Sequence, residues 1–129
     1  MNMHKAITRK DDYIHVDVTG TFLLSEANEC SVSIFEALAE HGVHRVLVDC
    51  RKLEGEPTTM ERFVLATFAA LEFSKFAESG VPRGTRFSYV GHEPLVDKRR
   101  FGETVATNRG LTVKVFTDYQ QAIEWLSGD

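Results

Sequence analysis

The sequence has little or none of several features that would place it in a specialised class of proteins. Cysteine occurs only twice, at Cys30 and Cys50, so neither a disulfide framework nor a zinc motif is expected. No stretch approaches the roughly 18 apolar residues that span a bilayer, and no apolar run follows the first residues, so no signal peptide is expected. GxGxxG and P-loop motifs are missing, which leaves nucleotide binding without support. These absences are typical of a cytoplasmic protein with reduced thiols.

Positive charge is also scarce. The chain has 15 lysines and arginines against 19 aspartates and glutamates, a net charge of −4. Nucleic-acid binders present a basic face, so no nucleic-acid partner is expected. The length of 129 residues suits one domain with its own core, and residues 1–129 are interpreted as a single domain.

Apolar spacing predicts an α/β fold. Strands are expected over residues 5–9, 13–18, 44–49, 86–91 and 111–116, and helices over 25–41, 58–79, 97–109 and 118–126. The first two strands form a hairpin, and the run at 44–49 is apolar at successive positions, which is typical of a central strand. Helices and strands then alternate. We therefore predict a five-stranded mixed, mainly parallel sheet with an antiparallel N-terminal edge strand and four helices.

Polar residues and one glycine predict where helices begin and end. Ser25 is expected to cap the first helix, and Gly42 to end it in the left-handed conformation. Thr58 and Glu61 form a T-x-x-E capping box for the second helix. The inward stripe of the first helix comprises Ala27, Cys30, Ile34, Phe35 and Leu38.

Short segments spread over essentially the whole chain resemble the SpoIIAA-like proteins, bacterial stand-alone relatives of the STAS domain. They are Val46-Leu47-Val48-Asp49, Arg62-Phe63, Asn108-Arg109-Gly110 through to Phe116, and Ala122-Ile123-Glu124-Trp125-Leu126. The resemblance implies the SpoIIAA-like/STAS fold, which is related to anti-sigma-factor antagonists and to CRAL-TRIO lipid-binding domains. It implies much more about the fold than about activity.

One departure from that pattern concerns regulation. Anti-sigma-factor antagonists carry an Asp-Ser-Ser-Gly-like motif with a phosphorylated serine where the second helix begins, and this chain has Glu56-Pro57-Thr58-Thr59-Met60 there. Thr58 and Thr59 still place hydroxyls at a helix N-terminus, where a phosphate would meet the positive end of the helix dipole. Two interpretations stay open, a phosphorylation switch and, for Thr58, an ordinary N-cap.

The helix at 58–79 has more apolar surface than a sheet can cover. Spacing of about 100° per residue directs one apolar set toward the sheet, comprising Phe63, Val64, Ala70, Leu71 and Phe73. Leu65, Phe68 and Phe76 fall on the opposite, charged face. A second apolar surface indicates a partner, a ligand or a membrane. The alternatives are a homodimer, a lid over an apolar or lipid-like ligand, and reversible membrane contact.

Two polar clusters are further candidates for a site. Asp49 and Arg51 follow the central strand, and ligands in open α/β sheets bind beyond the carboxyl ends of strands, so the segment 49–59 is expected to be a functional loop. Lys98, Arg99 and Arg100 are expected to open the third helix and could bind an anion such as a phosphate head group. The alternative is a solvated cluster balanced by neighbouring acidic residues.

No catalytic residue, metal site or cofactor is expected. His41 and His44 are separated by a helix end, and His4, His15 and His92 are interpreted as isolated. No nucleophile with a base and an orienting group can be assembled. The prediction is therefore a non-enzymatic regulatory or protein-interaction module, or alternatively a carrier of an apolar or lipid-like small molecule. Its predicted surface comprises Asp49, Arg51, Thr58, Thr59, Leu65, Phe68 and Phe76.

Overall fold

The computed structural model describes residues 2–128. In this part of the chain the elements are β1 (Met3–Arg9), β2 (Ile14–Thr21), α1 (Leu24–His41), β3 (Arg45–Glu54), α2 (Thr59–Glu78), β4 (Arg86–Val90), α3 (Phe101–Asn108), β5 (Thr112–Phe116) and α4 (Tyr119–Ser127). The strands form one sheet in the order β1-β2-β3-β4-β5, in which β1 is antiparallel to β2 and the other pairs are parallel. The predicted mixed sheet with four helices is confirmed for the described residues.

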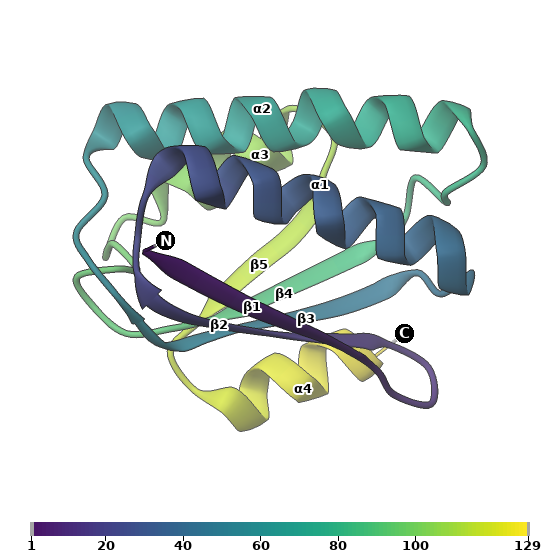
Figure 1. The fold of residues 1–129 in the computed structure, drawn as a ribbon, viewed down its shortest axis with the longest axis horizontal. Helices are drawn as coiled ribbons and strands as arrows, with labels where there is room; N and C mark the ends of the chain where they lie inside the picture. The colour runs from purple at the N-terminus through teal and green to yellow at the C-terminus, as the bar shows by residue number, and fades with distance from the viewer. Residues whose placement is uncertain (1, 129) are drawn as a thin grey trace.

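The strand order follows the chain order, and this determines where the helices lie. Each crossover adds its strand on the same side of the previous one, so crossovers of one hand bring α1, α2 and α3 to the same face, and α4 lies on the other (Figure 1). The order never reverses, so the sheet has no topological switch point, the place where open α/β sheets usually bind ligands. Within residues 2–128, no helix has the length and apolarity needed to cross a membrane.

The central position predicted for β3 is confirmed. Val46, Leu47 and Val48 are all buried, and consecutive side chains of a strand point to opposite faces, so both faces are covered at this point. The strand continues to Glu54 instead of ending at Asp49, because the last residues of β2 keep pairing with residues 52–54. The expected loop at 49–59 is therefore mostly strand, and only residues 55–58 connect β3 to α2.

The expected helix ends are confirmed at two positions. Thr58 and Glu61 form both hydrogen bonds of the capping box at the start of α2. Gly42 ends α1 with a left-handed φ of 69°, which a residue without a Cβ adopts without strain.

Two predicted helix starts are wrong. Ser25 lies inside α1, whose N-cap is Leu23, and the first turn is tied instead to β1 because the Glu26 carboxylate accepts from the Met3 N–H at 2.7 Å. α3 begins at Phe101 and not at Asp97, because Arg100 adopts a left-handed φ of 52° that interrupts the helical path.

The larger core layer lies between the sheet and α1–α2. The predicted inward stripe of α1 is confirmed, since all five of its residues are buried. Four phenylalanine rings from α1, α2 and β4 pack together with centroids 5.4–5.8 Å apart; they are Phe35, Phe73, Phe76 and Phe87. On the other face α4 packs over β3, β4 and β5 and covers a smaller core of Leu47, Val90, Phe116, Ala122 and Leu126.

The faces predicted for α2 are partly wrong. Phe63, Val64 and Leu71 are exposed instead of facing the sheet, whereas Leu65 and Phe76 are half-buried and pack against the core. The reason is that α2 also packs between α1 and α3, so its buried side is set by two helices as well as by the sheet. A second apolar surface does exist on α2, but other residues form it.

Candidate functional site

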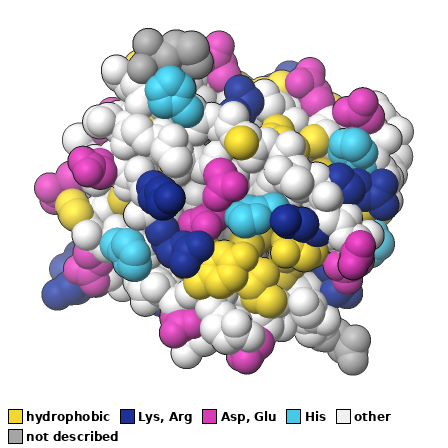
Figure 2. Space-filling model, turned by 60° about the horizontal axis from the view of Figure 1, so that its bottom comes forward, with side chains coloured by type: hydrophobic (Ala, Val, Ile, Leu, Met, Phe, Trp, Pro, Cys, Tyr) yellow, Lys and Arg dark blue, Asp and Glu magenta, His cyan; other side chains and the backbone are white. Residues whose placement is uncertain are grey.

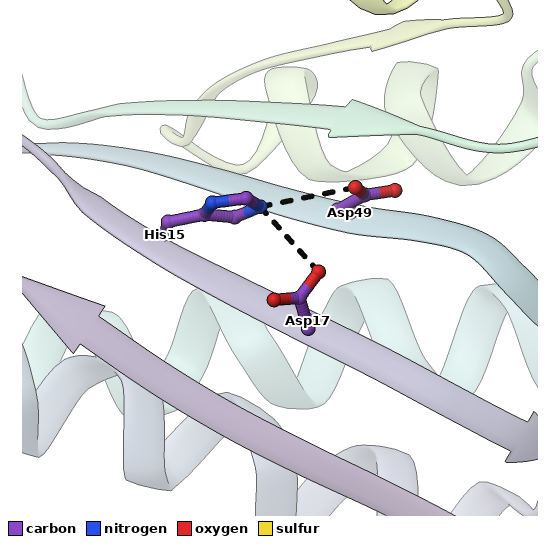
Figure 3. A group of neighbouring side chains, drawn as sticks. All are labelled: His15, Asp17 and Asp49. Carbon is purple, nitrogen blue, oxygen red and sulfur yellow. Dashed lines mark ion pairs between the residues drawn. The ribbon is translucent and has the colours of Figure 1, made fainter.

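A polar cluster lies on the α4 side of the sheet, where the helix no longer covers the strands. Alternation along β2 directs His15 and Asp17 to this side, and the parallel register pairs Asp17 with Asp49 of β3. Figure 3 shows the imidazole of His15 extending toward both carboxylates. The Nε2 atom of His15 lies 3.6 Å from Oδ1 of Asp17 and 3.8 Å from Oδ2 of Asp49.

The Asp49 carboxylate is held by Arg51. Its Oδ1 accepts from the Arg51 backbone N–H at 3.1 Å and from Nε at 3.0 Å, and its Oδ2 accepts from Nη2 at 2.8 Å. Burial alone would raise the pKa of Asp49, but the hydrogen bonds and charge of Arg51 outweigh it and hold that pKa below its usual range. The Arg51 guanidinium also stacks over the Tyr119 ring of α4, 4.2 Å from its centroid. Asp49 is therefore an oriented, ionised carboxylate.

His15 is the unusual member of this cluster. Its Nε2 atom is buried and has no hydrogen-bond partner among residues 2–128, and its side chain is 16% exposed. An unpaired buried polar atom is unfavourable. A polar hollow beside the two carboxylates is lined by Asp17, Val18, Thr19, Asp49, Arg51 and Lys52. The imidazole and the two carboxylates are donor types that can hold a metal ion, and each offers an atom within 4.8 Å of the others.

The surroundings of the cluster are mixed in character. Figure 2, which brings the α4 side forward, shows acidic, histidine and basic side chains gathered next to an apolar patch. Partly buried apolar residues that pack on the smaller core comprise Tyr13, Tyr119, Ile123 and Trp125. Polar chemistry and apolar surface thus adjoin each other on this side.

An apolar cavity of about 220 Å³ lies on the opposite side of the sheet, beneath the layer of α1, α2 and α3. Its wall includes Phe22, Cys30, Cys50, Leu65, Tyr89 and Val113. Burial raises the pKa of Cys30, Cys50 and Tyr89, so these wall residues are neutral. Leu65 contributes to the wall. Phe68 and Phe76, the residues of the predicted lid, are not among the residues that line this cavity, and Phe76 packs on Phe35.

The exposed apolar side of α2 forms a further surface. Its members are Met60, Phe63, Val64 and Leu71, with exposed fractions of 67%, 38%, 36% and 62%; we call them the α2 stripe. At its N-terminal end Thr58 and Thr59 are exposed, and the Thr58 Oγ1 accepts from the Glu61 N–H at 3.0 Å. The Arg109 guanidinium lies 5.6 Å from the Phe63 ring centroid.

The structure divides the predicted surface between two sides of the molecule. Asp49 and Arg51 point to the α4 side, where they meet His15 and Tyr119. The remaining members, Thr58, Thr59, Leu65, Phe68 and Phe76, all belong to α2 or its N-cap on the opposite face. The two sets therefore do not form one continuous site.

The basic cluster at 98–100 is also rearranged. The three residues precede α3 rather than opening it. Arg100 Nη1 donates to the Val115 carbonyl of β5 at 2.6 Å, and the Val115 N–H donates to Glu103 Oε1 at 2.6 Å. Lys98 and Arg99 are exposed. Arg100 thus has a structural contact, separate from its two neighbours.

The prediction that His15 is isolated is wrong. Two signals in the sequence could have revealed its neighbours. The first is that His15 and Asp17 are two residues apart on one strand, so their side chains share a face. The second is that Asp49 ends the apolar run of the next strand, which belongs to the mainly parallel sheet that the sequence predicts.

Comparisons with known proteins agree with this fold. The family model described as SpoIIAA-like matches residues 13–127. An anti-sigma factor antagonist from Mycobacterium paratuberculosis has a similar structure, with a TM-score of 0.63, 14% identity, and coverage of 98% of this chain and 95% of that one. The structure of the anti-sigma factor antagonist SpoIIAA in its unphosphorylated form is also similar, with a TM-score of 0.61, 11% identity and coverage of 98% of each chain.

A third solved structure is an uncharacterised protein with a SpoIIAA-like fold from Shewanella loihica PV-4. Its TM-score is 0.51 at 21% identity, with 97% of this chain and 93% of that chain covered. A comparison with curated proteins gives no match. Identities this low establish the fold alone, whereas the family match extends over most of the sequence. The chain belongs to the SpoIIAA-like family.

Proposed function

We propose that this protein is a non-enzymatic regulatory module that binds a partner protein through the α2 stripe. The observation that carries the proposal is the exposure of Met60, Phe63, Val64 and Leu71 on one helix. Neighbouring large apolar side chains on the surface of a folded protein typically mark an interaction site. Two structurally similar proteins are anti-sigma factor antagonists, which supports a regulatory role.

The spacing of the stripe fits a helix that docks along its length. Met60, Val64 and Leu71 are separated by four and seven residues, so they line one side of α2. Phe63 lies beside them, with its ring facing Arg109. A partner with an apolar groove and an acidic rim would pair with both features.

Thr59 provides a place to regulate such binding. Thr58 already uses its hydroxyl in the cap, whereas Thr59 is the exposed first residue of the helix. A phosphate on Thr59 would add negative charge next to Met60 and to the positive end of the helix dipole. We therefore propose Thr59, rather than Thr58, as the position of a phosphorylation switch. Phosphopeptide mapping of protein from its native host tests this.

The main test compares a variant with two apolar-to-serine substitutions in the α2 stripe with a variant that has one such substitution elsewhere. Protein carrying Met60→Ser and Leu71→Ser is used to capture partners from native extract beside the wild type and Leu23→Ser, which alters an exposed leucine outside α2. A partner retained by wild type and Leu23→Ser is then purified and titrated. The double variant should bind it at least about tenfold more weakly, since buried apolar anchors dominate interface energies.

Several results would contradict the proposal. Equal affinity of the double variant for the purified partner would remove the stripe from the interface. A concentration-dependent dimer that the same two substitutions dissociate would assign the stripe to self-association. Flotation of the wild type with liposomes, lost in the double variant, would assign it to membrane contact.

The apolar cavity favours a second candidate function, the binding of a small apolar molecule. At about 220 Å³ it exceeds the roughly 150 Å³ engineered cavity that admits benzene in another protein. Its wall is mainly apolar, with Arg62, Asp97, Arg100 and Glu103 as its charged members. Arg62 donates to the carbonyls of Leu95 and Pro94 at 2.7 and 3.0 Å, and Arg100 and Glu103 bond to the Val115 backbone. The relation to CRAL-TRIO lipid-binding domains implied by the sequence stays a prediction.

Filling the cavity tests this second candidate. Ala66 is buried in its wall, so Ala66→Leu should occupy the space and abolish binding of indole, a compact and largely apolar probe. Ala39→Leu adds the same atoms to an exposed site on α1 and should leave binding unchanged. The measurement is the change in NMR chemical shifts of residues around the cavity. Wild-type spectra that do not respond to indole or to octanoate would exclude the candidate.

A further inference from the structure

We propose that His15, Asp17 and Asp49 form a binding site for a divalent transition-metal ion of the zinc class. The three side chains come from two adjacent strands and converge on one point (Figure 3). Asp17 and Asp49 also line the polar hollow. One imidazole and two carboxylates are ligands that zinc accepts. An imidazole among the ligands also favours such an ion over magnesium or calcium, which prefer oxygen alone.

The separations of the three side chains fit an ion placed between them. Ligands about 2.0–2.1 Å from a tetrahedral zinc ion lie about 3.3–3.4 Å from one another. The His15 Nε2 atom is 3.6 Å from Asp17 Oδ1 and 3.8 Å from Asp49 Oδ2. These two distances are too long for hydrogen bonds and exceed the spacing of zinc ligands by only a few tenths of an ångström. The three ligand atoms all lie within 4.8 Å of one another, so a shift of the exposed Asp17 side chain would complete the geometry.

The unpaired nitrogen of His15 is an independent observation. Within residues 2–128 the buried Nε2 atom has no hydrogen-bond partner, although it points at two carboxylates. A coordinated cation would give this nitrogen the partner that the surrounding protein does not supply. The nitrogen belongs to a side chain that is 84% buried (16% exposed), so solvent does not readily provide a substitute.

Arg51 orients one of the ligands from outside the site. Its hydrogen bonds fix both oxygens of Asp49, as outer partners of metal-binding carboxylates commonly do. Its stacking on Tyr119 holds the guanidinium against α4. Two carboxylates and one guanidinium leave a net negative charge at the cluster before any ion binds. The positive charges of Arg51 and of Lys52, which lines the hollow, should lower the affinity of the site for a cation.

The fourth coordination position would face the hollow. Three protein ligands with a fourth, open position are the arrangement of an accessible zinc site, in which water completes the tetrahedron. Asp17 is 53% exposed and can move to close the remaining distance to the ion. The site is therefore expected to exchange its metal readily.

The test uses paired substitutions in the full chain. Protein stripped of metal with a chelator is titrated with Zn²⁺ by calorimetry and with Co²⁺ by visible absorption, which reports tetrahedral coordination. His15→Gln is compared with His4→Gln, and Asp17→Asn with Asp11→Asn; His4 and Asp11 are exposed and lie outside the cluster. Circular dichroism confirms that each variant is folded, and Asp17→Asn keeps the test valid if His15→Gln does not fold.

The expected result is one Zn²⁺ per wild-type chain, with a raised Tm and a tetrahedral Co²⁺ spectrum. His15→Gln and Asp17→Asn should each weaken Zn²⁺ binding by at least about tenfold, because mutating even the outer partners of metal ligands costs about 10–100-fold in affinity. Both controls should bind as the wild type does. Wild-type protein that takes up no Zn²⁺ at millimolar concentration overturns the proposal. The proposal is also overturned if His15→Gln and Asp17→Asn bind Zn²⁺ with the affinity of the wild type.

Discussion

The two faces of the sheet differ in how completely they are covered. On one face α1, α2 and α3 form a continuous layer over a core of aromatic rings, and the space left within it is apolar. On the other, α4 covers β3 to β5, and the polar cluster of His15, Asp17 and Asp49 lies where this coverage stops. Coverage thus separates two kinds of surroundings: an apolar cavity under the three helices, and charged groups beside α4.

The difference comes from the strand order. Three successive crossovers of one hand bring their helices to the same face. Within residues 2–128 the other face receives α4 alone, the helix after β5. A parallel sheet is normally buried on both faces, so the part that α4 leaves open must carry polar side chains. His15 and Asp17 satisfy this requirement on β2.

The largest expected effect of a substitution comes from the aromatic core. Phe73 is 4% exposed. Its ring centroid lies 5.4 Å from that of Phe35 and 5.5 Å from that of Phe87. Phe73→Ala should lower the free energy of unfolding by about 3–5 kcal/mol. Trp125→Ala, which removes a half-buried ring from α4, should lower it by about 2 kcal/mol. Urea unfolding measures both, and equal losses would mean that the two faces contribute alike.

The reactivity of the two cysteine thiols tests how well the face under α1, α2 and α3 is covered. Because burial raises the pKa of Cys30 and Cys50, less thiolate is present at pH 8 than in the unfolded chain. Alkylation by iodoacetamide should therefore be at least about tenfold slower in native protein than in urea. Mass spectrometry follows the reaction. Rapid native labelling of both cysteines would show that the cavity is open to solvent.

The cap of α2 should have an effect of about 1 kcal/mol on stability. Thr58→Ala removes the hydroxyl that accepts from the Glu61 N–H, and the loss of an N-cap has about this magnitude. Thr58→Ser should restore most of it, whereas Thr59→Ala removes no capping bond. Thermal unfolding measures the three variants, and a Thr58→Ala protein as stable as the wild type would argue against the cap.

The smallest effect is expected beneath α4. The buried Ser88 hydroxyl donates to the Ala122 carbonyl at 3.0 Å and joins β4 to α4. Ser88→Ala should cost about 0.5–1 kcal/mol, the net value of a neutral hydrogen bond. Ser127→Ala, at an exposed position of the same helix, is the control. If Ser88→Ala lowered the free energy of unfolding more than Phe73→Ala does, the face under α4 would contribute more to stability than the face under α1–α3.

Features set by local pattern could be predicted from the sequence. The run Val46-Leu47-Val48 indicated a central strand, and T-x-x-E at Thr58 indicated the start of α2; both are confirmed. These signals depend on residues a few positions apart, so neighbouring elements do not alter them.

Features set by packing between elements could not be predicted in this way. Helical spacing gives the angular order of Phe63, Leu65 and Leu71 around α2, but the buried side depends on where α1 and α3 touch the helix. The position of Asp49 beside His15 depends on the register of two parallel strands. The cavity is a space that side chains from several elements leave unfilled. The sequence of one segment therefore does not predict it.

The two bonds to Val115 have a consequence for how the protein behaves in crowded solution. β5 is the last strand of the sheet, and an uncovered last strand offers its amides to any extended chain that approaches. Arg100 and Glu103 occupy the carbonyl and the N–H of Val115. A chain that paired with β5 would have to displace both side chains at that residue, so they hinder intermolecular strand pairing there.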